Sequence, residues 1–316
     1  MRIGIDTMGG DFIPQNPLEG VALALPNLPA DVEIVLVGDP QRLQAEAPRY
    51  GVPLNEQVQV LAATQVIGMD ENPSRAVVQK SDSTINVGIQ ALKEGQLDAF
   101  VSAGNTGAVV AASVLKLGNL PGVSRPTLGA FYPYGDNQYS LICDVGANVD
   151  CKPEHLVQFA LIGTVYMRTV MGIPHPRVAL LNIGEEPSKG NILAQQAYAL
   201  LQENPLINFV GNAEGRVLPK GFADIYVTDG FVGNILLKFG ESIYELLREK
   251  VPPSPILERL NYENIGGLPF LGTRGNVIIG HGLSSPKAFR NMIFRALVIA
   301  RARLSEKIAE AFQTYA

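Results

Sequence analysis

The stretch VSAGNTGAVVAASVLKLG, residues 101–118, passes from a short apolar run through a polar, glycine-containing turn into an apolar segment of helical length. The same order recurs along the chain. It is found at RIGIDTMGGD, VEIVLVGDP, YSLICDVGANVD, RVALLNIGEEPSKG, INFVGNAEGR, ADIYVTDGFVGN and NVIIGHGLSS. Helices are expected over residues 87–95, 108–118, 153–172, 191–204, 234–250 and 286–312. Apolar strands alternating with helices predict an α/β fold with a mostly parallel sheet covered on both faces. Ligands of such sheets bind where the turns that follow the strands meet.

Composition narrows the class of protein. The chain has 316 residues, 47% of them hydrophobic, and a net charge of −5, which argues against general nucleic-acid binding. No apolar stretch reaches about 18 residues without a charge or a breaker, so no membrane-spanning helix is expected. The opening MRIGID reads as a strand and not as a signal peptide. Cys143 and Cys151 fit neither a metal site nor a disulfide framework, which favours the cytoplasm.

The turn SAGNTG has two interpretations. A glycine-containing turn that opens a helix presents backbone N–H groups and the positive end of the helix dipole, which suits phosphate. Its members in this hypothesis are Ser102, Gly104, Asn105, Thr106 and Gly107. The alternative is that Asn or Thr simply caps the helix. The turn matches neither the Gly-x-x-x-x-Gly-Lys-Ser/Thr loop nor the Gly-x-Gly-x-x-Gly fingerprint of nucleotide sites.

Other strand-end turns carry polar side chains of the same kind. In DTMGGD an Asp at a strand end is followed by paired glycines, a pattern that also occurs in actin-like sugar and acetate kinases. Those kinases need a second glycine-rich turn in a duplicated half, and the one candidate, TDGFVGN, does not repeat the strand–helix context of the first half. Lys189 in NIGEEPSKGN can neutralise a phosphate or a developing oxyanion, or it can be a solvated loop residue. The remaining candidates for phosphate or substrate binding are Asp6, Gly9, Gly10, Asn148, Asp229, Gly230, Asn234, His281 and Ser284.

The chain offers anion-binding turns without an obvious protein nucleophile. It contains no Gly-x-Ser-x-Gly elbow, no Cys with a convincing His partner and no His/Cys spacing typical of a metal site. One reaction fits this inventory, in which phosphate itself attacks an activated acyl group. A thioester would need little else, because a thiol with a pKa near ~8.5 leaves without a strong general acid.

Nine motifs, taken together and in order, resemble the phosphate acyltransferase family of bacterial phospholipid synthesis. They are DTMGGD, DENPSRA, VSAGNTGA, RPTLG, DVGAN, NIGEEPSKGN, FVGNAEGR, VTDGFVGN and IIGHGLSSPKAF. The resemblance implies conversion of fatty acyl-[acyl-carrier-protein] and inorganic phosphate to acyl phosphate. It also implies a three-layer α/β/α Rossmann-like sandwich, similar to phosphotransacetylase and the isocitrate/isopropylmalate dehydrogenases, in a single domain over 1–316.

The resemblance implies partners and roles as well. No metal or nucleotide cofactor is expected. A cytoplasmic homodimer is expected to bind the membrane reversibly and to supply a membrane glycerol-3-phosphate acyltransferase. Lys189 and Asn234 are the expected catalytic residues, acting on phosphate and on the thioester carbonyl. Where the family commonly has a basic run after the second motif, this chain keeps only Lys80. If that run holds carrier protein or phosphate, Lys80 and the C-terminal basic face are expected to contribute more here.

Two further segments carry hypotheses. The apolar but Pro- and Gly-interrupted segment 251–272 is either a dimer-interface hairpin or a membrane-contacting tip, with Leu257 and Leu260 at the membrane. Lys287, Arg290 and Arg301 fall within about 60° on one expected helix face, where they either dock an acidic carrier protein or are merely solvated.

Three rival functions remain. A phosphotransacetylase would act on short acyl-CoA. A decarboxylating dehydrogenase would need a carboxylate cluster and a nucleotide site, and neither is evident in the sequence. A membrane-surface scaffold would bind carrier protein without turnover.

Overall fold

The computed structural model describes residues 1–135, 138–252 and 254–315. The chain folds as two compact units, each built from two separate segments. The first unit joins Met1–Gly118 to Tyr262–Arg301, and the second joins Asn119–Asn261 to Ala302–Ala316. The prediction of one domain over 1–316 stays a prediction.

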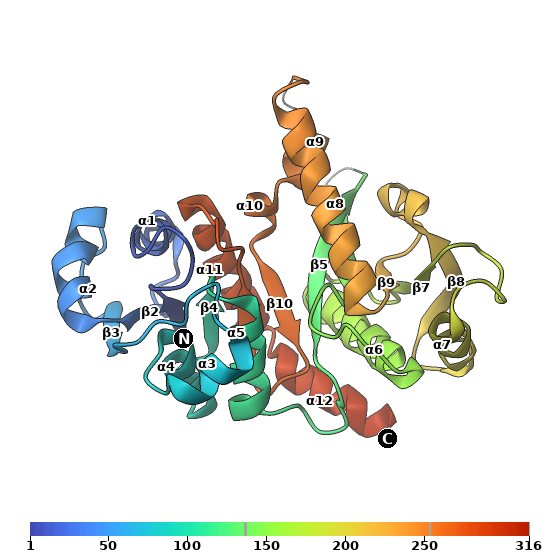
Figure 1. The fold of residues 1–316 in the computed structure, drawn as a ribbon, viewed down its shortest axis with the longest axis horizontal. Helices are drawn as coiled ribbons and strands as arrows, with labels where there is room; N and C mark the ends of the chain where they lie inside the picture. Colours follow the sequence, from blue (N-terminus) through green and yellow to red (C-terminus); the bar gives the residue numbers. More distant parts are fainter. Residues whose placement is uncertain (136–137, 253, 316) are drawn as a thin grey trace. The chain divides into compact units, whose positions relative to one another are not determined.

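The first unit is built on six strands in the order β3-β2-β1-β4-β11-β10. Figure 1 labels β2, β3, β4 and β10 of this unit. They are β1 (Arg2–Asp6), β2 (Glu33–Gly38), β3 (Val58–Ala62), β4 (Ala99–Ser102), β10 (Leu268–Leu271) and β11 (Asn276–Ile279). Neighbours from β3 to β11 are parallel, and β10 pairs antiparallel with β11. Every residue of β4 and four of the five in β1 are buried, as expected for strands covered on both faces.

Helices of the first unit follow the strands. They are α1 (Gln15–Ala24), α2 (Pro40–Glu46), α3 (Pro73–Gln79), α4 (Thr84–Lys93), α5 (Thr106–Ala112), α10 (Tyr262–Ile265) and α11 (Pro286–Arg301), with 3-10 turns at Leu25–Asn27 and Ala47–Tyr50. α1 packs on α11, although they lie far apart in the sequence. Gly20 permits this close approach, because a Cβ there would overlap the side chain of Phe289.

The second unit has five strands in the order β5-β6-β9-β7-β8. They are β5 (Thr127–Tyr134), β6 (Gln138–Cys143), β7 (Arg177–Asn182), β8 (Asn208–Glu214) and β9 (Ile225–Val227). β5 and β6 form an antiparallel pair, and the other neighbours are parallel. Its helices are α6 (Pro153–Thr169), α7 (Ile192–Glu203), α8 (Gly230–Arg248), α9 (Pro255–Leu260) and α12 (Leu304–Tyr315), with a 3-10 segment at Gly215–Lys220. α6 packs on β6 and β9, and α12 packs on α6.

The predicted α/β class with a mostly parallel sheet is confirmed, and two predicted helices are corrected. The helix expected over 108–118 is α5 followed by a π-helical turn at Ser113–Leu117. The helix expected over 286–312 is two helices, α11 and α12. Arg303 between them has a φ of 52°, a left-handed conformation that a continuous helix cannot contain.

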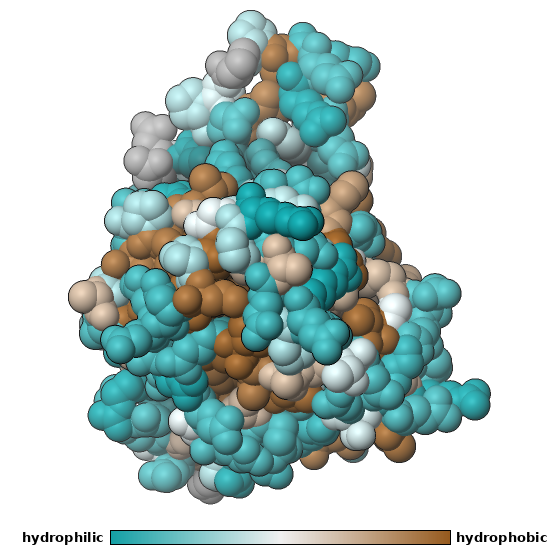
Figure 2. Space-filling view, turned by 90° about the vertical axis from the view of Figure 1, so that its left-hand side faces the viewer, coloured by the Kyte–Doolittle hydropathy of each residue, from teal (hydrophilic) through white to brown (hydrophobic). Residues whose placement is uncertain are grey.

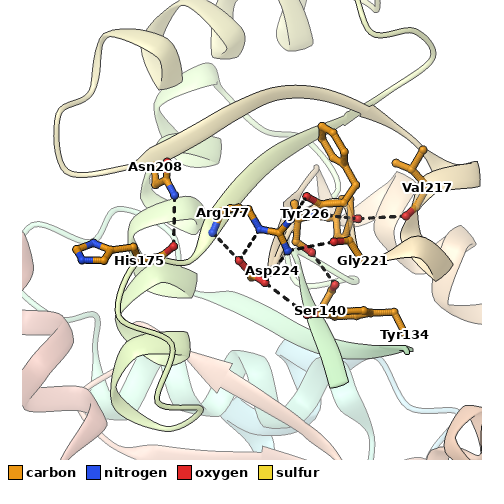
Figure 3. A network of polar contacts seen from close by, with 11 residues as sticks. Tyr134, Ser140, His175, Arg177, Asn208, Val217, Gly221, Asp224 and Tyr226 are labelled. Atoms are coloured by element: carbon orange, nitrogen blue, oxygen red, sulfur yellow. Dashed lines mark hydrogen bonds and ion pairs between the residues drawn. The ribbon is translucent and has the colours of Figure 1, made fainter. Parts of the chain in front are cut away.

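A polar network holds the amino ends of the second unit's strands (Figure 3). Arg177 begins β7, and Asp224 precedes β9. The Arg177 guanidinium donates to both carboxylate oxygens of Asp224 at 3.1 Å, and the Arg177 main-chain N–H donates to the same carboxylate at 2.7 Å. This pairing raises the pKa of Arg177. The hydroxyl of Tyr134 also reaches the Asp224 carboxylate, at 3.5 Å. The network lies at the end of the strands opposite to the turns that carry the candidate site residues, so we assign it to structure.

Candidate active site

Three glycine-rich turns meet at the carboxyl edge of the first unit's sheet. β1, β4 and β11 are adjacent and parallel, so the turns that follow them emerge side by side. The N–H of Asp11 donates to the carbonyl of Gly282 at 2.9 Å, and the side-chain amide of Asn16 donates to the carbonyl of Ser284 at 3.0 Å. The sequence prediction that these turns gather at one edge is therefore confirmed for DTMGGD, SAGNTG and IIGHGLSS.

Asp6 is the buried centre of this edge. Its carboxylate accepts from the hydroxyl of Ser102 at 2.7 Å and from the N–H of Met8 at 3.1 Å. The Ser102 hydroxyl in turn accepts from the N–H of Gly104 at 3.1 Å. Burial raises the pKa of Asp6, and the hydrogen bonds from Ser102 and Thr84 oppose that rise. Asp6 is fully buried, and its carboxylate holds the two turns together instead of being presented at the surface.

Glycine is required in the first turn because of this packing. A Cβ on Gly9 would lie 2.5 Å from the Asp6 carboxylate and 2.7 Å from the nitrogen of Gly104. Gly10 has a φ of 115°, a conformation that L side chains rarely adopt. The predicted importance of these glycines thus has a physical basis in the backbone.

The side chain of Asn105 forms hydrogen bonds within the chain, whereas the sequence analysis expected it to donate hydrogen bonds to phosphate. Its amide nitrogen lies 3.2 Å from each of the carbonyl oxygens of Gly68, Met69 and Glu71. Its oxygen accepts from the N–H of Ala108 and so caps α5. Asn105 therefore fastens the loop 68–71 to the start of α5, and the capping alternative raised from the sequence is correct for this side chain.

Thr106 and Gly107 keep their candidate role. They are the first two residues of α5, whose N–H groups have no carbonyl partner within the helix. Thr106 is exposed and Gly107 is partly exposed. An anion at this turn would therefore be held by backbone N–H groups and the Thr106 hydroxyl rather than by Asn105 or by the N–H of Gly104.

The loop fastened by Asn105 is also held by an ion pair. The ammonium of Lys80 donates to the Glu71 carboxylate at 2.6 Å and to the carbonyl of Val66 at 2.8 Å. The hydrogen bond from Lys80, followed by one from the N–H of Gly68, lowers the pKa of Glu71. Lys80 is thus engaged within the chain, so it does not replace the family's basic run as a free cation.

His281 and Ser284 differ in accessibility. His281 is exposed, and its Nδ1 accepts from the N–H of Leu283 at 3.2 Å, which places the proton of a neutral ring on Nε2. Its ring lies 5.7 Å from that of Tyr262. Ser284 is buried, and its N–H donates to the carbonyl of His281. His281 can therefore reach a ligand, whereas Ser284 shapes the turn.

A second set of turns lies at the carboxyl edge of the second unit, where β6, β9 and β7 are adjacent. Asp144 is buried there and accepts from the N–H groups of Leu128, Ala147 and Asn148. Burial raises the pKa of Asp144, and these bonds oppose the rise. The Asn148 side-chain amide donates to Asp144 at 2.8 Å and to the carbonyl of Pro126 at 2.7 Å. Both hydrogens of this amide are used within the chain, so neither is free for a substrate in this structure, and the predicted substrate contact of Asn148 stays a prediction.

The start of α8 is locked onto this turn. The N–H of Gly230 donates to the carbonyl of Asn148 at 2.7 Å. Asp229 caps the helix by accepting from the N–H of Val232 at 2.9 Å. Asn234 donates one amide hydrogen to the carbonyl of Val145 at 3.0 Å and keeps the other. Asn234 is the member of this group that can still donate to a ligand.

Lys189 lies in the turn between β7 and α7 and is exposed. The side chain of Asn182 holds this turn, because its amide donates to the carbonyl of Lys189 at 3.1 Å and its oxygen accepts from the N–H of Ile183. Asn191 caps α7 through the N–H of Ala194. The structure thus fixes the backbone on both sides of Lys189 and exposes its side chain.

A cavity of about 530 Å³ opens beside this turn, within the second unit. Asn182, Gly190, Asn191 and Asp229 line one part of it. Apart from Thr228 and Gly215, the remaining wall is apolar and includes Leu181, Ala194, Val232, Ile235, Leu236 and Phe239. Sequence reasoning missed these residues. The pattern that could have indicated this cavity wall is the spacing of apolar residues at 232, 235, 236 and 239 of α8. From the sequence alone, this spacing was interpreted only as the periodicity of a helix.

The predicted site residues therefore fall into two sets. The first unit brings Asp6, Gly9, Gly10 and Ser102 together with the turns that contain Gly104 and His281. The second unit brings Asn148, Asp229, Gly230 and Asn234 together, with Lys189 at the neighbouring strand. Asp229 belongs to the second unit, whereas Asp6 and His281 belong to the first.

The proposed docking cations are only partly available. Lys287 is exposed. Arg290 lies 5.2 Å from the ring centroid of Phe294 and is partly buried. Arg301 forms an ion pair with Asp31 at 2.7 Å, which lowers the pKa of Asp31 and neutralises much of the cation.

Figure 2 shows one face of the molecule, on which apolar and hydrophilic residues are interspersed.

The membrane-contact prediction needs a correction. Leu257 is only 5% exposed, and Leu260 is half-buried. α9 packs on α8 and β5, which places Leu257 inside. The exposed apolar residue of α9 is Ile256, at 48%. Among the described residues no helix has the length and apolar character needed to span a membrane.

Comparison with known proteins agrees with this architecture. A phosphotransacetylase from Streptococcus pyogenes superposes with a TM-score of 0.63 over 97% of this chain and 94% of that one, at 17% sequence identity. This likeness confirms the predicted three-layer α/β/α fold. The fold and its glycine-rich strand ends define the class only as an α/β protein with a three-layer sandwich.

Sequence relatives narrow the class to a family. Residues 1–252 match the family described as fatty acid synthesis protein. A phosphate acyltransferase of Desulfitobacterium hafniense is 43% identical over 321 residues, covering 95% of this chain and 93% of that protein. One of Dictyoglomus thermophilum is 41% identical over 329 residues, covering 98% and 97%. The chain belongs to the phosphate acyltransferase family.

Proposed function

We propose that the protein is an enzyme that transfers a fatty acyl group from acyl carrier protein to inorganic phosphate, and that its product feeds phosphatidic acid and phospholipid synthesis. The observation that carries this proposal is the near full-length similarity to phosphate acyltransferases, at 41% to 43% identity. The site is consistent with this proposal. Asp6 and Asp144 are buried and hydrogen-bonded to backbone turns, whereas Lys189 is exposed beside an apolar cavity.

The reaction needs no protein nucleophile. A phosphate oxygen adds to the thioester carbonyl carbon, forming a C–O bond and a tetrahedral oxyanion. Collapse of the oxyanion breaks the C–S bond and releases acyl phosphate and the carrier thiolate, which takes a proton from solvent. A thiol pKa near ~8.5 makes this a good leaving group. The chain's part is to position phosphate and to stabilise the oxyanion.

The available donors suggest roles. The N–H groups of Thr106 and Gly107 and the Thr106 hydroxyl would bind phosphate. In the second unit, considered by itself, the Lys189 ammonium would neutralise a phosphate or a developing oxyanion, and the second amide hydrogen of Asn234 would polarise the thioester carbonyl. Asp6 is a positioning residue, because it is buried beneath the turns.

The test is phosphate-dependent turnover. Purified protein is mixed with palmitoyl-carrier protein and phosphate, and acyl phosphate is trapped with hydroxylamine, with acetyl-CoA as a parallel donor. We expect product from the carrier thioester only when phosphate is present. Product from acetyl-CoA alone would favour a phosphotransacetylase, and no product from either would favour a scaffold.

Carrier-protein docking is proposed at Lys287 and Arg290, the two available cations of the basic face. Lys287→Glu should raise KM for palmitoyl-carrier protein and flatten its salt dependence, because exposed charges are screened within ~10 Å at 0.1 M salt. Lys93→Glu, at another exposed lysine of the first unit, is the matched control. Equal effects of the two substitutions on KM would mean that the net charge of the protein, and not this particular face, determines carrier-protein binding.

A cytoplasmic homodimer with reversible membrane association completes the proposal, and its acyl phosphate would pass to a membrane glycerol-3-phosphate acyltransferase. Leu246, Val251 and Ile256 support the association, because each is exposed near the end of α8 or in the segment after it. A solution mass of twice 33.9 kDa would support the dimer, and a monomer at micromolar concentration would contradict it.

A further inference from the structure

The cavity between α7 and α8 is shaped for an apolar ligand. Its volume, about 530 Å³, falls within the range of roughly 300–1,000 Å³ that is usual for small-molecule sites. Leu180 and Leu181 of β7 form its floor, Leu193 and Ala194 of α7 one wall and residues of α8 the other.

Three of the four polar side chains that line the cavity are already hydrogen-bonded within the chain, and the fourth is Thr228. Asn182 is hydrogen-bonded to the turn of Lys189, Asn191 caps α7 and Asp229 caps α8. These three groups hold the backbone at the mouth, and apart from Thr228 and two glycines the rest of the lining is apolar. A ligand whose long part is hydrocarbon therefore suits this lining better than a polar one, because hydrocarbon needs no hydrogen-bond partner when it is buried.

α8 presents unusually apolar residues toward this space. Its only buried residues are Gly230 and Gly233, whereas Ile235 is 55% exposed and Phe239 is 64% exposed. Val232, Ile235, Leu236 and Phe239 recur at spacings of three and four, so they form one stripe along the helix. Exposed apolar area of this kind marks a binding surface.

We infer that this cavity binds the hydrocarbon chain of the acyl donor and selects its length. The inference rests on the proposed function and locates one part of its substrate. Gly190 and Asp229 at the mouth adjoin the Lys189 turn and the start of α8, where the thioester would react. A chain attached to that thioester would extend along the α8 stripe toward Phe239. A second copy of this protein is the other occupant to be tested.

The absence of tryptophan from the chain gives a direct binding assay. Phe239→Trp places a single fluorophore in the cavity wall, and Ala199→Trp places one on an exposed site of α7 outside it. Adding palmitate should shift the emission of the first variant to shorter wavelength and leave the second unchanged. No shift in Phe239→Trp, or equal shifts in both, would overturn the inference. A shift that follows protein concentration without palmitate would assign the cavity to a second copy and overturn it as well.

Chain-length selectivity tests the same inference in turnover. Ala194→Trp fills the cavity, so kcat/KM should fall at least tenfold for palmitoyl-carrier protein and at most about twofold for the butyryl form. The expectation follows because each buried methylene tightens binding about fourfold. Ala199→Trp should retain the wild-type preference. Equal losses for both donors would overturn the inference while leaving the proposed function intact. Palmitate binding without any turnover would leave the cavity assignment intact and reject the function.

Discussion

The side-chain nitrogen of Asn105 lies 3.2 Å from the main-chain oxygen of Glu71, and this contact joins a loop to the start of a helix. The same nitrogen reaches two more carbonyls of that loop, while the Asn105 oxygen caps α5. Asn105 is therefore expected to act through the conformation of the turn and not by touching phosphate.

Two substitutions of Asn105 test separately the contributions of its side-chain oxygen and its side-chain nitrogen to stability. Asn105→Ala removes the cap and the loop contacts, and we expect it to lower the free energy of unfolding by about 1–3 kcal/mol. Asn105→Asp keeps the capping oxygen but turns a carboxylate toward the loop carbonyls, so it should not restore stability. Thermal unfolding of both variants measures this. Wild-type thermal stability in Asn105→Asp would mean that only the helix cap, and not the contacts with the loop, contributes to stability.

The pair Lys80–Glu71 should make stability depend on pH. The pKa of Glu71 is lowered from 4.5 in the folded state, chiefly by the hydrogen bond from Lys80. Its contribution is therefore fully present above the unfolded carboxyl pKa and is lost as pH falls through the folded pKa. The stability difference between the wild type and Glu71→Gln should be largest above pH 4.5 and should shrink in acid. Denaturant unfolding across pH checks this, and a difference that grows in acid would contradict it.

Lys189→Ala tests the proposed electrostatic role. We expect kcat to fall about 10²-fold with unchanged thermal stability, because the exposed ammonium would act mainly on charge that develops in the transition state. Lys220→Ala, at another exposed lysine of the second unit, serves as the control. Near-normal turnover in a folded Lys189→Ala protein would remove this residue from the mechanism.

Membrane association should depend on Ile256 and not on Leu257. Val251→Glu combined with Ile256→Glu places charge at two exposed apolar positions and should release the protein from vesicles of anionic lipid with its stability kept. Leu257→Glu should instead destabilise the protein, because Leu257 is buried. Sedimentation with vesicles measures the first effect. Undiminished pelleting of the double variant would reject this surface.

The sequence predicted the fold well because its strands are apolar on both faces and end in recognisable turns. β1, β4, β7 and β9 all follow that pattern, and their turns carry the candidate residues. The break at Arg303 was not predictable, because residues 302–305 contain no glycine or proline that would end a helix. The return of β10 and β11 to the first unit depends on pairing between distant segments, which local patterns do not encode.

The candidate site was predictable in its turns and much less in its side chains. An asparagine in or near a strand-end turn can cap a helix, fasten a loop or bind a ligand, and the sequence alone does not distinguish the three roles. Asn105 and Asn148 are internally bonded, whereas Asn234 keeps a donor, and only the three-dimensional partners distinguish them. The apolar cavity was not predictable for a similar reason. Apolar residues along one face of α8 have the same spacing in the sequence whether that face packs on a core or binds a ligand.

The transfer of labelled phosphate tests the central proposal most directly. Palmitoyl-carrier protein and phosphorus-labelled inorganic phosphate are incubated with the protein, and the label is sought in a long-chain acyl phosphate. The account predicts one labelled acyl phosphate for each carrier thiol released. Thiol release without label in the acyl product would indicate hydrolysis and would contradict phosphate as the nucleophile.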